Sequence, residues 1–222
     1  MNTVEAIKCR HSVRNYIDKE IDEKTINILQ QEVDKCNAES GLHLQLVTNE
    51  PGGFSGMMAK YGRFANVKNY FALVGKNGKD LDEKVGYYGE HLVLEAQKLG
   101  LNTCWVALTY NKRKAKFDVQ TGEKLVCVIS LGYGETQGNV RRSKTLEDVS
   151  NFSDGSEEWF KNGVELALLA PTAMNQQKFY FEKTESGVKA TAGLGFYAKV
   201  DLGIAKYHFE IGAGKENFIW EK

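Results

Sequence analysis

The sequence Arg10-His11-Ser12-Val13-Arg14 places two cations and a hydroxyl at alternate positions near the amino terminus. In an extended segment, alternate side chains point to the same side, so Arg10, Ser12 and Arg14 are expected to share one side. A guanidinium group pairs with two oxygens of a phosphate at once and keeps its charge. The motif therefore predicts a phosphate-sized anion site, although the same spacing is also typical of a solvated basic turn.

A second stretch whose residues could contact a ligand, Ala170 to Gln177, lies far along the chain. Pro171 follows an apolar helical run, and because proline cannot continue a helix, it is expected to end that helix in a fixed turn. Asn175 carries a donor and an acceptor, which suits the edge of a ring that displays both. Taken alone, the stretch is also explained by a helix stop and a polar turn. The two stretches together favour a common ligand.

Composition narrows the class of protein. The 222 residues are 42% hydrophobic and 26% charged, with equal numbers of basic and acidic side chains. This is the composition of a globular chain, and a zero net charge argues against a general nucleic-acid surface. No apolar run is long enough for a membrane span and the first twenty residues do not resemble a secretory signal, so we expect a cytoplasmic protein without membrane contact.

The cysteines and histidines do not form a recognisable site. The four cysteines have no CxxC pair and the four histidines have no metal-ligand spacing, so neither a metal nor a disulfide framework is expected. His91 and Glu95 are four residues apart on a predicted helix, and we interpret them as a helix-surface pair.

Periodicity, capping residues and glycine or proline breaks predict an α+β fold, in which a mostly antiparallel sheet is flanked by helices. The helices are expected at 3–9 (capped by Thr3), 22–37, 82–99, 157–170 and 200–212. The strands are expected at 42–48, 70–75, 103–108, 124–131, 179–182, 188–191 and 218–220. Between them, the aromatic residues Tyr61, Phe64 and Tyr70 accompany a loop over 51–69. This loop is either a mobile flap over a flat ligand or a surface loop with aromatics in the core.

The two parts of the chain resemble each other in layout. The segment 37–44 occupies the place that 170–177 occupies later, and 86–91 similarly corresponds to 201–206. Chance similarity between α/β units explains the same pattern. If the echo is real, one chain holds two pseudo-symmetric halves of a unit that elsewhere pairs as a dimer.

Several motifs together resemble the nitroreductase family of FMN flavoproteins, in its two-halved branch. They are Arg10 to Arg14, Gly100 to Trp105, Leu131 to Gly134, Arg142 to Lys144, Ala170 to Gln176, Asp201 to Ala205 and His208 to Glu210. They cover nearly the whole chain in the family's order. The resemblance implies a nitroreductase-like fold with a first half over 1–150 and a second half over 151–222, together one compact unit.

The resemblance also implies the residues that bind FMN. Arg10, His11, Ser12 and Arg14 match the family's grip on the phosphate and ribityl chain, and Arg142 and Lys144 match its second basic pair. Trp105, Val106 and Ala107 are expected near the reactive N5 atom. Pro171, Thr172, Ala173 and Asn175 match the stretch that lies along the ring, which ordinary members receive from a partner subunit. The family often has Pro-Trp where this chain has Gln177 and Lys178, so the pocket beside the ring is expected to be wider or more basic.

The implied activity is an FMN-dependent NAD(P)H oxidoreductase that passes hydride through N5 to nitroaromatic or quinone-like small molecules. The flavin carries the chemistry, so no catalytic side chain is expected. The alternatives are an FMN carrier or redox-responsive protein without turnover, and a relative without flavin. A dinucleotide fold through the glycines of 193–198 is rejected, because too little chain follows for a βαβ unit and no acidic residue follows at the required place.

Overall fold

The computed structural model describes residues 1–221 as a mixture of helices and short strands. The helices are α1 (Thr3–Cys9), α2 (Glu23–Ser40), α3 (Met57–Tyr61), α4 (Leu81–Lys98), α5 (Leu146–Val149), α6 (Glu158–Ala167) and α7 (Ala198–Ala213), with 3-10 turns η1 (Gly52–Phe54), η2 (Ala173–Asn175) and η3 (Lys215–Asn217). The strands are β1 (His43–Val47), β2 (Asn69–Lys76), β3 (Asn102–Val106), β4 (Glu123–Gly132), β5 (Phe179–Lys183), β6 (Val188–Ala192) and β7 (Trp220–Glu221). The predicted α+β class, with an antiparallel sheet flanked by helices, is confirmed.

The chain forms two compact units that interleave along the sequence. Unit 1 contains residues 1–9, 82–90 and 140–222, and unit 2 contains residues 10–81 and 91–139. Helix α4 therefore contributes residues to both units. The sequence predicts two related halves, 1–150 and 151–222. These compact units do not test whether the halves are related, so that division stays a prediction.

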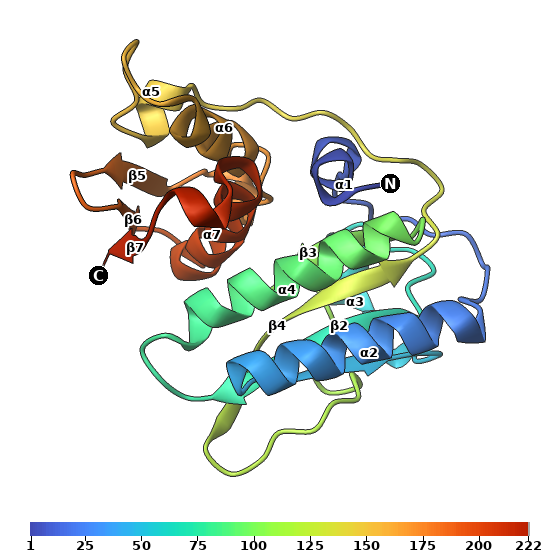
Figure 1. Ribbon diagram of the computed structural model, residues 1–222. Helices are drawn as coiled ribbons and strands as arrows, with labels where there is room; N and C mark the ends of the chain where they lie inside the picture. Colours follow the sequence, from blue (N-terminus) through green and yellow to red (C-terminus); the bar gives the residue numbers. More distant parts are fainter. Residues whose placement is uncertain (222) are drawn as a thin grey trace. The chain divides into compact units, whose positions relative to one another are not determined.

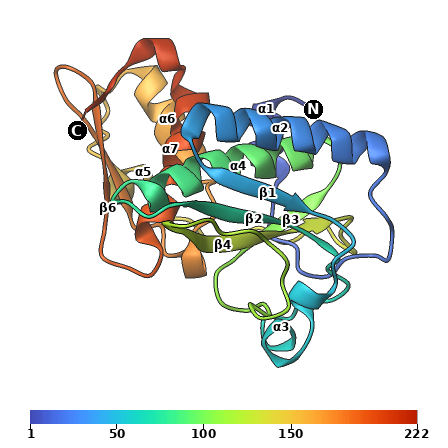
Figure 2. The same cartoon turned by 90° about the horizontal axis from the view of Figure 1, so that it is seen from below.

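Unit 2 is built on a four-stranded antiparallel sheet in the order β1-β2-β4-β3. Figure 1 labels β2, β3 and β4 of this sheet, and Figure 2 shows β1 beside β2. Helix α2 lies on one face of this sheet, and α3 with its flanking loops lies on the other face (Figure 2). All of the residues of β2 except its last are buried, as expected for a strand that is covered on both faces. The core on the α3 face consists of Val13, Tyr16, Phe54, Ala59, Phe64, Val67, Tyr70, Ala72, Cys104, Val106, Tyr110 and Val128.

Local signals explain where the first helices begin and end. The Asp22 side chain accepts a hydrogen bond from the backbone N–H of Thr25 at 2.9 Å, and Gly41 ends α2 in the left-handed conformation at φ 71°. Helix α1 has the predicted bounds, but its predicted cap is wrong. Asn2 accepts from the N–H of Glu5 while Glu5 accepts from the N–H of Asn2, so the capping box begins one residue before Thr3.

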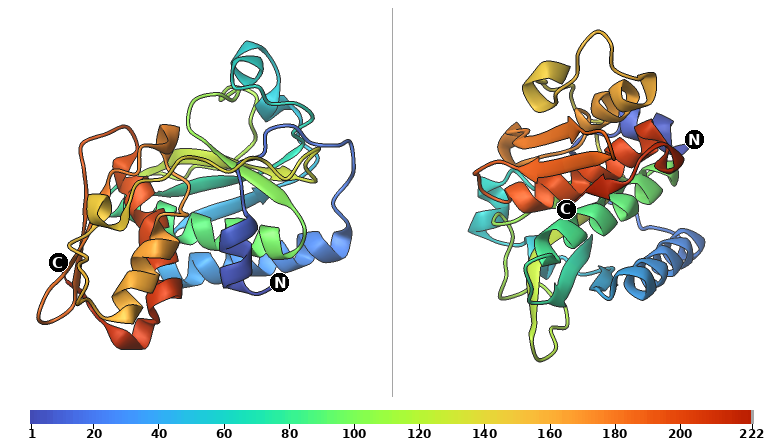
Figure 3. Two further views of the ribbon diagram at one scale, coloured as in Figure 1. Left: turned by 90° about the horizontal axis from the view of Figure 1, so that it is seen from above. Right: turned by 60° about the vertical axis from the view of Figure 1, so that its left-hand side comes forward.

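Unit 1 packs helices against a small sheet. Helices α6 and α7 pack together, and α7 also contacts the antiparallel hairpin of β5 and β6 (Figure 3). Strand β7 pairs with β6 in parallel, so β6, α7 and β7 form a short βαβ unit. Aromatic rings fill the space between these elements, with Phe181 stacked on Phe209 at a centroid distance of 4.7 Å.

Two glycines allow helix backbones to touch within unit 1. A Cβ atom at Gly86 of α4 would lie 2.0 Å from the carbonyl oxygen of Val200 in α7. A Cβ atom at Gly203 of α7 would lie 2.0 Å from the carbonyl oxygen of Glu83 in α4. The contact is reciprocal. Glu83, whose carbonyl faces Gly203, lies three residues before Gly86, and Val200, whose carbonyl faces Gly86, lies three residues before Gly203.

Two further sequence predictions meet the structure here. The pairing of His91 with Glu95 is wrong: the ring of His91 faces Glu32 of α2 at 2.8 Å, and Glu95 accepts from Lys98 at 2.6 Å. Of the three aromatics expected with the 51–69 loop, Phe64 and Tyr70 are buried in the core and Tyr61 is exposed.

Candidate functional site

The Arg10-to-Arg14 motif in unit 2 runs alongside the edge strand β3. Ser12 forms a parallel bridge with Thr103, and the backbone N–H of Val13 donates to the carbonyl of Thr103 at 3.0 Å. The Val13 side chain is buried in the core of unit 2. The motif is thus extended, which is the conformation that places the side chains of Arg10, Ser12 and Arg14 on one side.

Arg10, Ser12 and Arg14 all act on one buried group, the thiol of Cys104 on β3. Burial raises the pKa of this thiol, while the positive charge of Arg14, a hydrogen bond with Ser12 and the charge of Arg10 each work to lower it. Arg10 is buried, whereas Arg14 is exposed and lies over the ring of Phe64 at 5.9 Å from its centroid. We call these three residues the amino-terminal cluster; it brings two positive charges and a hydroxyl close to Cys104 in the middle of β3.

The backbone that carries this cluster is fixed from both sides. The Tyr16 hydroxyl donates to the carbonyl of Val13 at 2.7 Å and lies 2.8 Å from Ser130 Oγ. Burial raises the pKa of Tyr16 far above its ordinary value, so the phenol stays neutral. The N–H of Ala65 donates to the carbonyl of Arg14 at 3.1 Å. The cluster is therefore preorganised by core contacts.

The remaining residues expected near the flavin in unit 2 follow from the same strand. Trp105 and Val106 are the last residues of β3 and pair with Ile129 and Val128 of β4, and Ala107 continues the chain. Because β3 is at the edge of the sheet, alternate backbone groups point away from β4. His11 packs against Gly138, where a Cβ atom would lie 2.5 Å from the Cβ of His11.

The Pro-to-Asn stretch forms a tight bend in unit 1. Helix α6 ends at Ala167, three residues earlier than predicted, and a tightened turn leads to the buried Pro171. Three residues that are not glycine then adopt the left-handed conformation: Met174 at φ 53°, Asn175 at φ 54° and Gln177 at φ 44°. Each such residue costs of the order of 1–2 kcal/mol, so the rest of the unit must hold the bend in place.

Asp201 in the first turn of α7 holds this bend. Its Oδ1 accepts from the N–H of Ala173 at 2.9 Å, and its Oδ2 accepts from Gln176 Nε2 at 2.7 Å. The Asp201 side chain is almost fully buried, and burial raises its pKa from 3.8 to about 6 against the opposing effect of these two hydrogen bonds.

The second basic segment is attached to the same bend. The backbone N–H of Lys144 donates to Gln177 Oε1 and its Nζ donates to the Gln177 carbonyl, both at 2.9 Å. Asn175 Nδ2 donates to the carbonyl of Arg142 at 2.8 Å, so the amide is partly engaged within the protein. The Arg142 side chain is exposed.

The structure therefore assembles the predicted site residues in two groups, one in each unit. Sequence reasoning missed Cys104, Gln177 and Asp201 as supporting residues. Gln177 is buried and also donates from Nε2 to the Leu168 carbonyl at 2.9 Å. An acidic residue in the first turn of an otherwise apolar helix was the available signal for Asp201.

The glycine loop over 193–198 behaves differently from the prediction. The argument that too little chain follows for a βαβ unit is wrong, because β6, α7 and β7 form one. The group that lies close to the backbone of this loop is nevertheless a protein side chain, not a dinucleotide: a Cβ atom at Gly195 would lie 2.5 Å from Gln176 Oε1.

Among the described residues, no helix is long and apolar enough to cross a membrane. No group of three or more His, Cys, Asp or Glu residues in this part of the chain is arranged to hold a metal ion.

Comparisons with known proteins agree with this fold. A family model described as "Putative TM nitroreductase" matches residues 2–213. The chain is similar to the crystal structure of a putative nitroreductase from Thermotoga maritima, with a TM-score of 0.69 and 22% identity over 97% of this chain and 85% of that one.

Two shorter structures are similar to part of the chain. A putative nitroreductase from Desulfovibrio desulfuricans, solved in complex with FMN, gives a TM-score of 0.53 and 14% identity over 66% of this chain and 95% of that one. A nitroreductase family protein from Streptococcus pneumoniae gives 0.53 and 12% identity over 67% and 98%. The search of curated proteins found no match.

Proposed function

Because the chain belongs to the nitroreductase family described as "Putative TM nitroreductase", we propose that it is an FMN-dependent oxidoreductase. The observation that carries this proposal is the amino-terminal cluster, in which Arg10 and Arg14 act by charge and Ser12 by a hydrogen bond on the Cys104 thiol of β3. The complex of the Desulfovibrio desulfuricans protein with FMN supports the choice of cofactor.

The chemistry of the donor groups fits the cofactor. A phosphate dianion requires several positive charges and hydrogen-bond donors, and the cluster supplies two guanidinium groups and a hydroxyl from a rigid segment. Arg10, His11, Ser12 and Arg14 would hold the phosphate and ribityl chain, and Trp105, Val106 and Ala107 would offer backbone groups to the ring. In unit 1, we assign Arg142 and Lys144 to the phosphate, and Pro171, Thr172, Ala173 and Asn175 to the ring.

When bound, FMN supplies hydride chemistry at N5 between NAD(P)H and a nitroaromatic or quinone-like acceptor that take turns at its exposed face. The protein's own part is to bind and orient the cofactor. The strained bend suits this role, because backbone held in one shape by Asp201 and Gln177 needs little reorganisation when a ligand binds.

The test is flavin binding. Purified protein is expected to be yellow, to release FMN on denaturation and to bind added FMN. Arg10→Ala and Arg14→Ala are each expected to weaken FMN binding about 10- to 100-fold, because a hydrogen bond to a charged group contributes about 1.5–3 kcal/mol. Lys24→Ala on α2 is the matched control, since it removes an exposed charge far along the same unit, and it should leave binding unchanged. Protein that stays colourless and ignores added FMN would refute the proposal.

Turnover separates an enzyme from a carrier with the same binding residues. An enzyme consumes NADH or NADPH steadily when a quinone or nitroaromatic is supplied. A carrier would be yellow and would not sustain that consumption beyond one equivalent of flavin.

We further propose that residues 1–150 and 151–222 are related halves that together replace a dimer. The reciprocal contact between Gly86 and Gly203 supports this, because mutual contact of equivalent positions is the mark of a two-fold interface. The two glycines are 117 residues apart, and so are His91 and His208, which shifts the correspondence of 86–91 with 201–206 expected from the sequence by two residues. Analytical ultracentrifugation tests the idea: a monomer that keeps its FMN supports it, and FMN binding confined to a dimer contradicts it.

A further inference from the structure

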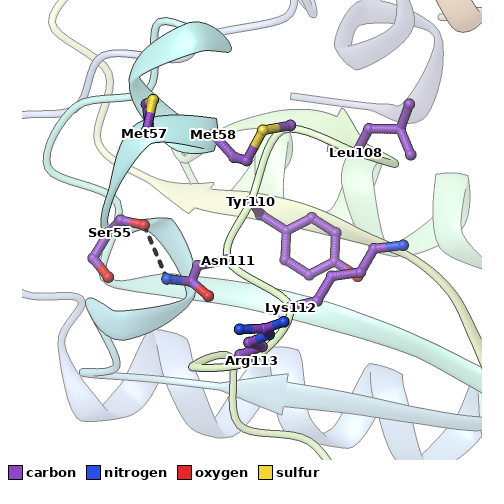
Figure 4. A pocket seen from close by; sticks show the side chains of 8 residues that line it. All are labelled: Ser55, Met57, Met58, Leu108, Tyr110, Asn111, Lys112 and Arg113. Atoms are coloured by element: carbon purple, nitrogen blue, oxygen red, sulfur yellow. Dashed lines mark hydrogen bonds between the residues drawn. The ribbon is translucent and has the colours of Figure 1, made fainter.

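A pocket of about 350 Å³ lies within unit 2, between α3 and the loop that follows β3 (Figure 4). Its volume falls in the range of small-molecule sites, which is about 300–1,000 Å³. The residues that line it are Ser55, Met57, Met58, Leu108, Tyr110, Asn111, Lys112 and Arg113.

The lining is largely apolar although it faces solvent. Met57, Met58 and Leu108 are 85%, 48% and 51% exposed, and they gather from two segments around one opening (Figure 4). Methionine side chains are flexible and polarisable, and they adapt readily to flat, apolar ligands. Exposed apolar side chains that cluster around a hollow are typical of a binding surface.

The two charged side chains of the lining, Lys112 and Arg113, are both basic. Lys112 lies over the Tyr110 ring at 5.9 Å from its centroid, and Lys112 and Arg113 are both exposed. Residues 51–79 and 99–117, which include every lining residue, contain no Asp or Glu. Within the described chain, no carboxylate forms an ion pair with Lys112 or Arg113. A chain of zero net charge thus concentrates positive potential here, which attracts anions.

The floor of the pocket is rigid. The N–H of Asn111 donates to the Gly53 carbonyl at 2.7 Å, and its Nδ2 donates to the Ser55 carbonyl at 3.3 Å, which ties the two lining segments together. Tyr110 is buried beside Phe54, at a ring distance of 6.3 Å. A preformed floor reduces the entropy that a ligand would lose on ordering its site.

From this combination we infer that the pocket binds a small aromatic anion, with its ring against the methionines and Leu108 and its anionic group toward Lys112 and Arg113. The site uses no residue assigned to FMN. Leu108 directly follows Ala107, which is assigned to the flavin ring, so we place this second site next to the proposed cofactor residues, with a lining that is complete without the cofactor.

The methionines provide the test. The chain has four methionines, and Met57 and Met58 line the pocket while Met1 and Met174 do not. Protein labelled with ¹³C at the methionine methyl groups and saturated with FMN would be titrated with 2-naphthalenesulfonate, and the signals assigned with single Met→Leu variants. The Met57 and Met58 signals are expected to shift with saturation, while Met1 and Met174 stay in place. Met1 is 63% exposed, so it reports general adsorption of the probe, whereas Met174 lies between Ala173 and Asn175 and reports binding of the probe beside the flavin ring.

Two matched comparisons isolate the charge. The uncharged 2-naphthalenesulfonamide is expected to bind about tenfold more weakly than the sulfonate. The double variant Lys112→Gln/Arg113→Gln should weaken sulfonate binding about tenfold, whereas Lys114→Gln/Lys116→Gln removes the same charge from exposed positions outside the lining and should change it less than about threefold.

Four results would overturn the inference, and three of them come from the titration with the probe: no shift of Met57 and Met58, equal shifts of all four methionines, or equal binding of the sulfonate and the sulfonamide. If FMN alone shifts Met57 and Met58 and the sulfonate displaces it, the pocket is not a second site. A colourless protein that still shows the sulfonate-dependent shifts would refute the cofactor proposal and leave this one intact.

Discussion

The burial of Asp201 makes a quantitative prediction about stability and pH. The pKa of this carboxyl rises from 3.8 to about 6 on folding, so the folded protein holds its proton more tightly than the unfolded chain does. Stability therefore falls as pH rises, because the folded state must bury a carboxylate above about pH 6. The full effect of a shift of about 2 units is about 3 kcal/mol, fully present as stability below about pH 4 and lost above about pH 6. Between pH 4.5 and 7.5, about 2 kcal/mol of it should be lost.

The assay compares wild-type protein with Asp201→Asn in urea at pH 4.5, 5.5, 6.5 and 7.5. Asparagine has nearly the same shape, and its oxygen still accepts a hydrogen bond from Ala173 or Gln176, while it has no proton to lose. The free energy of unfolding of wild type relative to the variant should fall by about 2 kcal/mol from pH 4.5 to 7.5, with about half of that loss reached by about pH 5.3.

The comparison with a variant is necessary because other carboxylates act in the opposite direction. Hydrogen bonds lower the pKa of Asp22, Glu123 and Glu221, so their contribution is present above their ordinary pKa values and is lost as pH falls. These groups are common to both proteins and cancel in the difference. A difference that stays flat across this pH range would refute the claim that the Asp201 carboxyl is held in a desolvated site.

Three further changes test the packing. Gly86→Ala should destabilise by about 3 kcal/mol or more in urea unfolding, because the added methyl meets a backbone carbonyl, whereas Gly155→Ala meets nothing and should be neutral; equal effects would contradict the close crossing. His208→Phe should lower the free energy of unfolding by about 3–5 kcal/mol, because Glu90, which is fully buried and 2.9 Å from the ring, loses this partner. The added change Glu90→Leu should recover most of that loss, and a double variant as unstable as the single one would count against the pair. Met174→Gly should leave stability unchanged or raise it by about 1 kcal/mol, since it relieves a left-handed residue whose side chain is exposed, and a clear loss would show that the bend is not strained there.

The elements that could be predicted from the sequence are those whose signals are local. Asp22 and Gly41 mark the ends of α2 because a side-chain oxygen at the start and a residue without Cβ at the end satisfy groups within a few positions. The same reasoning misplaced the cap of α1 by one residue, since Asn2 and Thr3 are both good capping residues.

Contacts between distant segments could not be predicted. Glu95 is the nearest carboxylate to His91 along the helix, yet the ring faces Glu32, which is 59 residues away. The left-handed conformations of Met174 and Gln177 have no local signal, because both residues ordinarily avoid them and hydrogen bonds from distant residues such as Asp201 and Leu168 help to hold the bend. The residues predicted to bind the cofactor were identified by the ordered set of motifs and their resemblance to the family. Residue spacing alone indicated only an anion site near the amino terminus.

A substitution at Gly86 or Gly203 can hardly be compensated by a second substitution elsewhere. In most packed cores, an enlarged side chain can be accommodated by trimming a neighbour. Here the neighbour is a main-chain oxygen on each side, which every amino acid carries. A change at either position has no second-site partner that could make room, so this crossing is expected to resist substitution more strongly than the larger apolar residues around it.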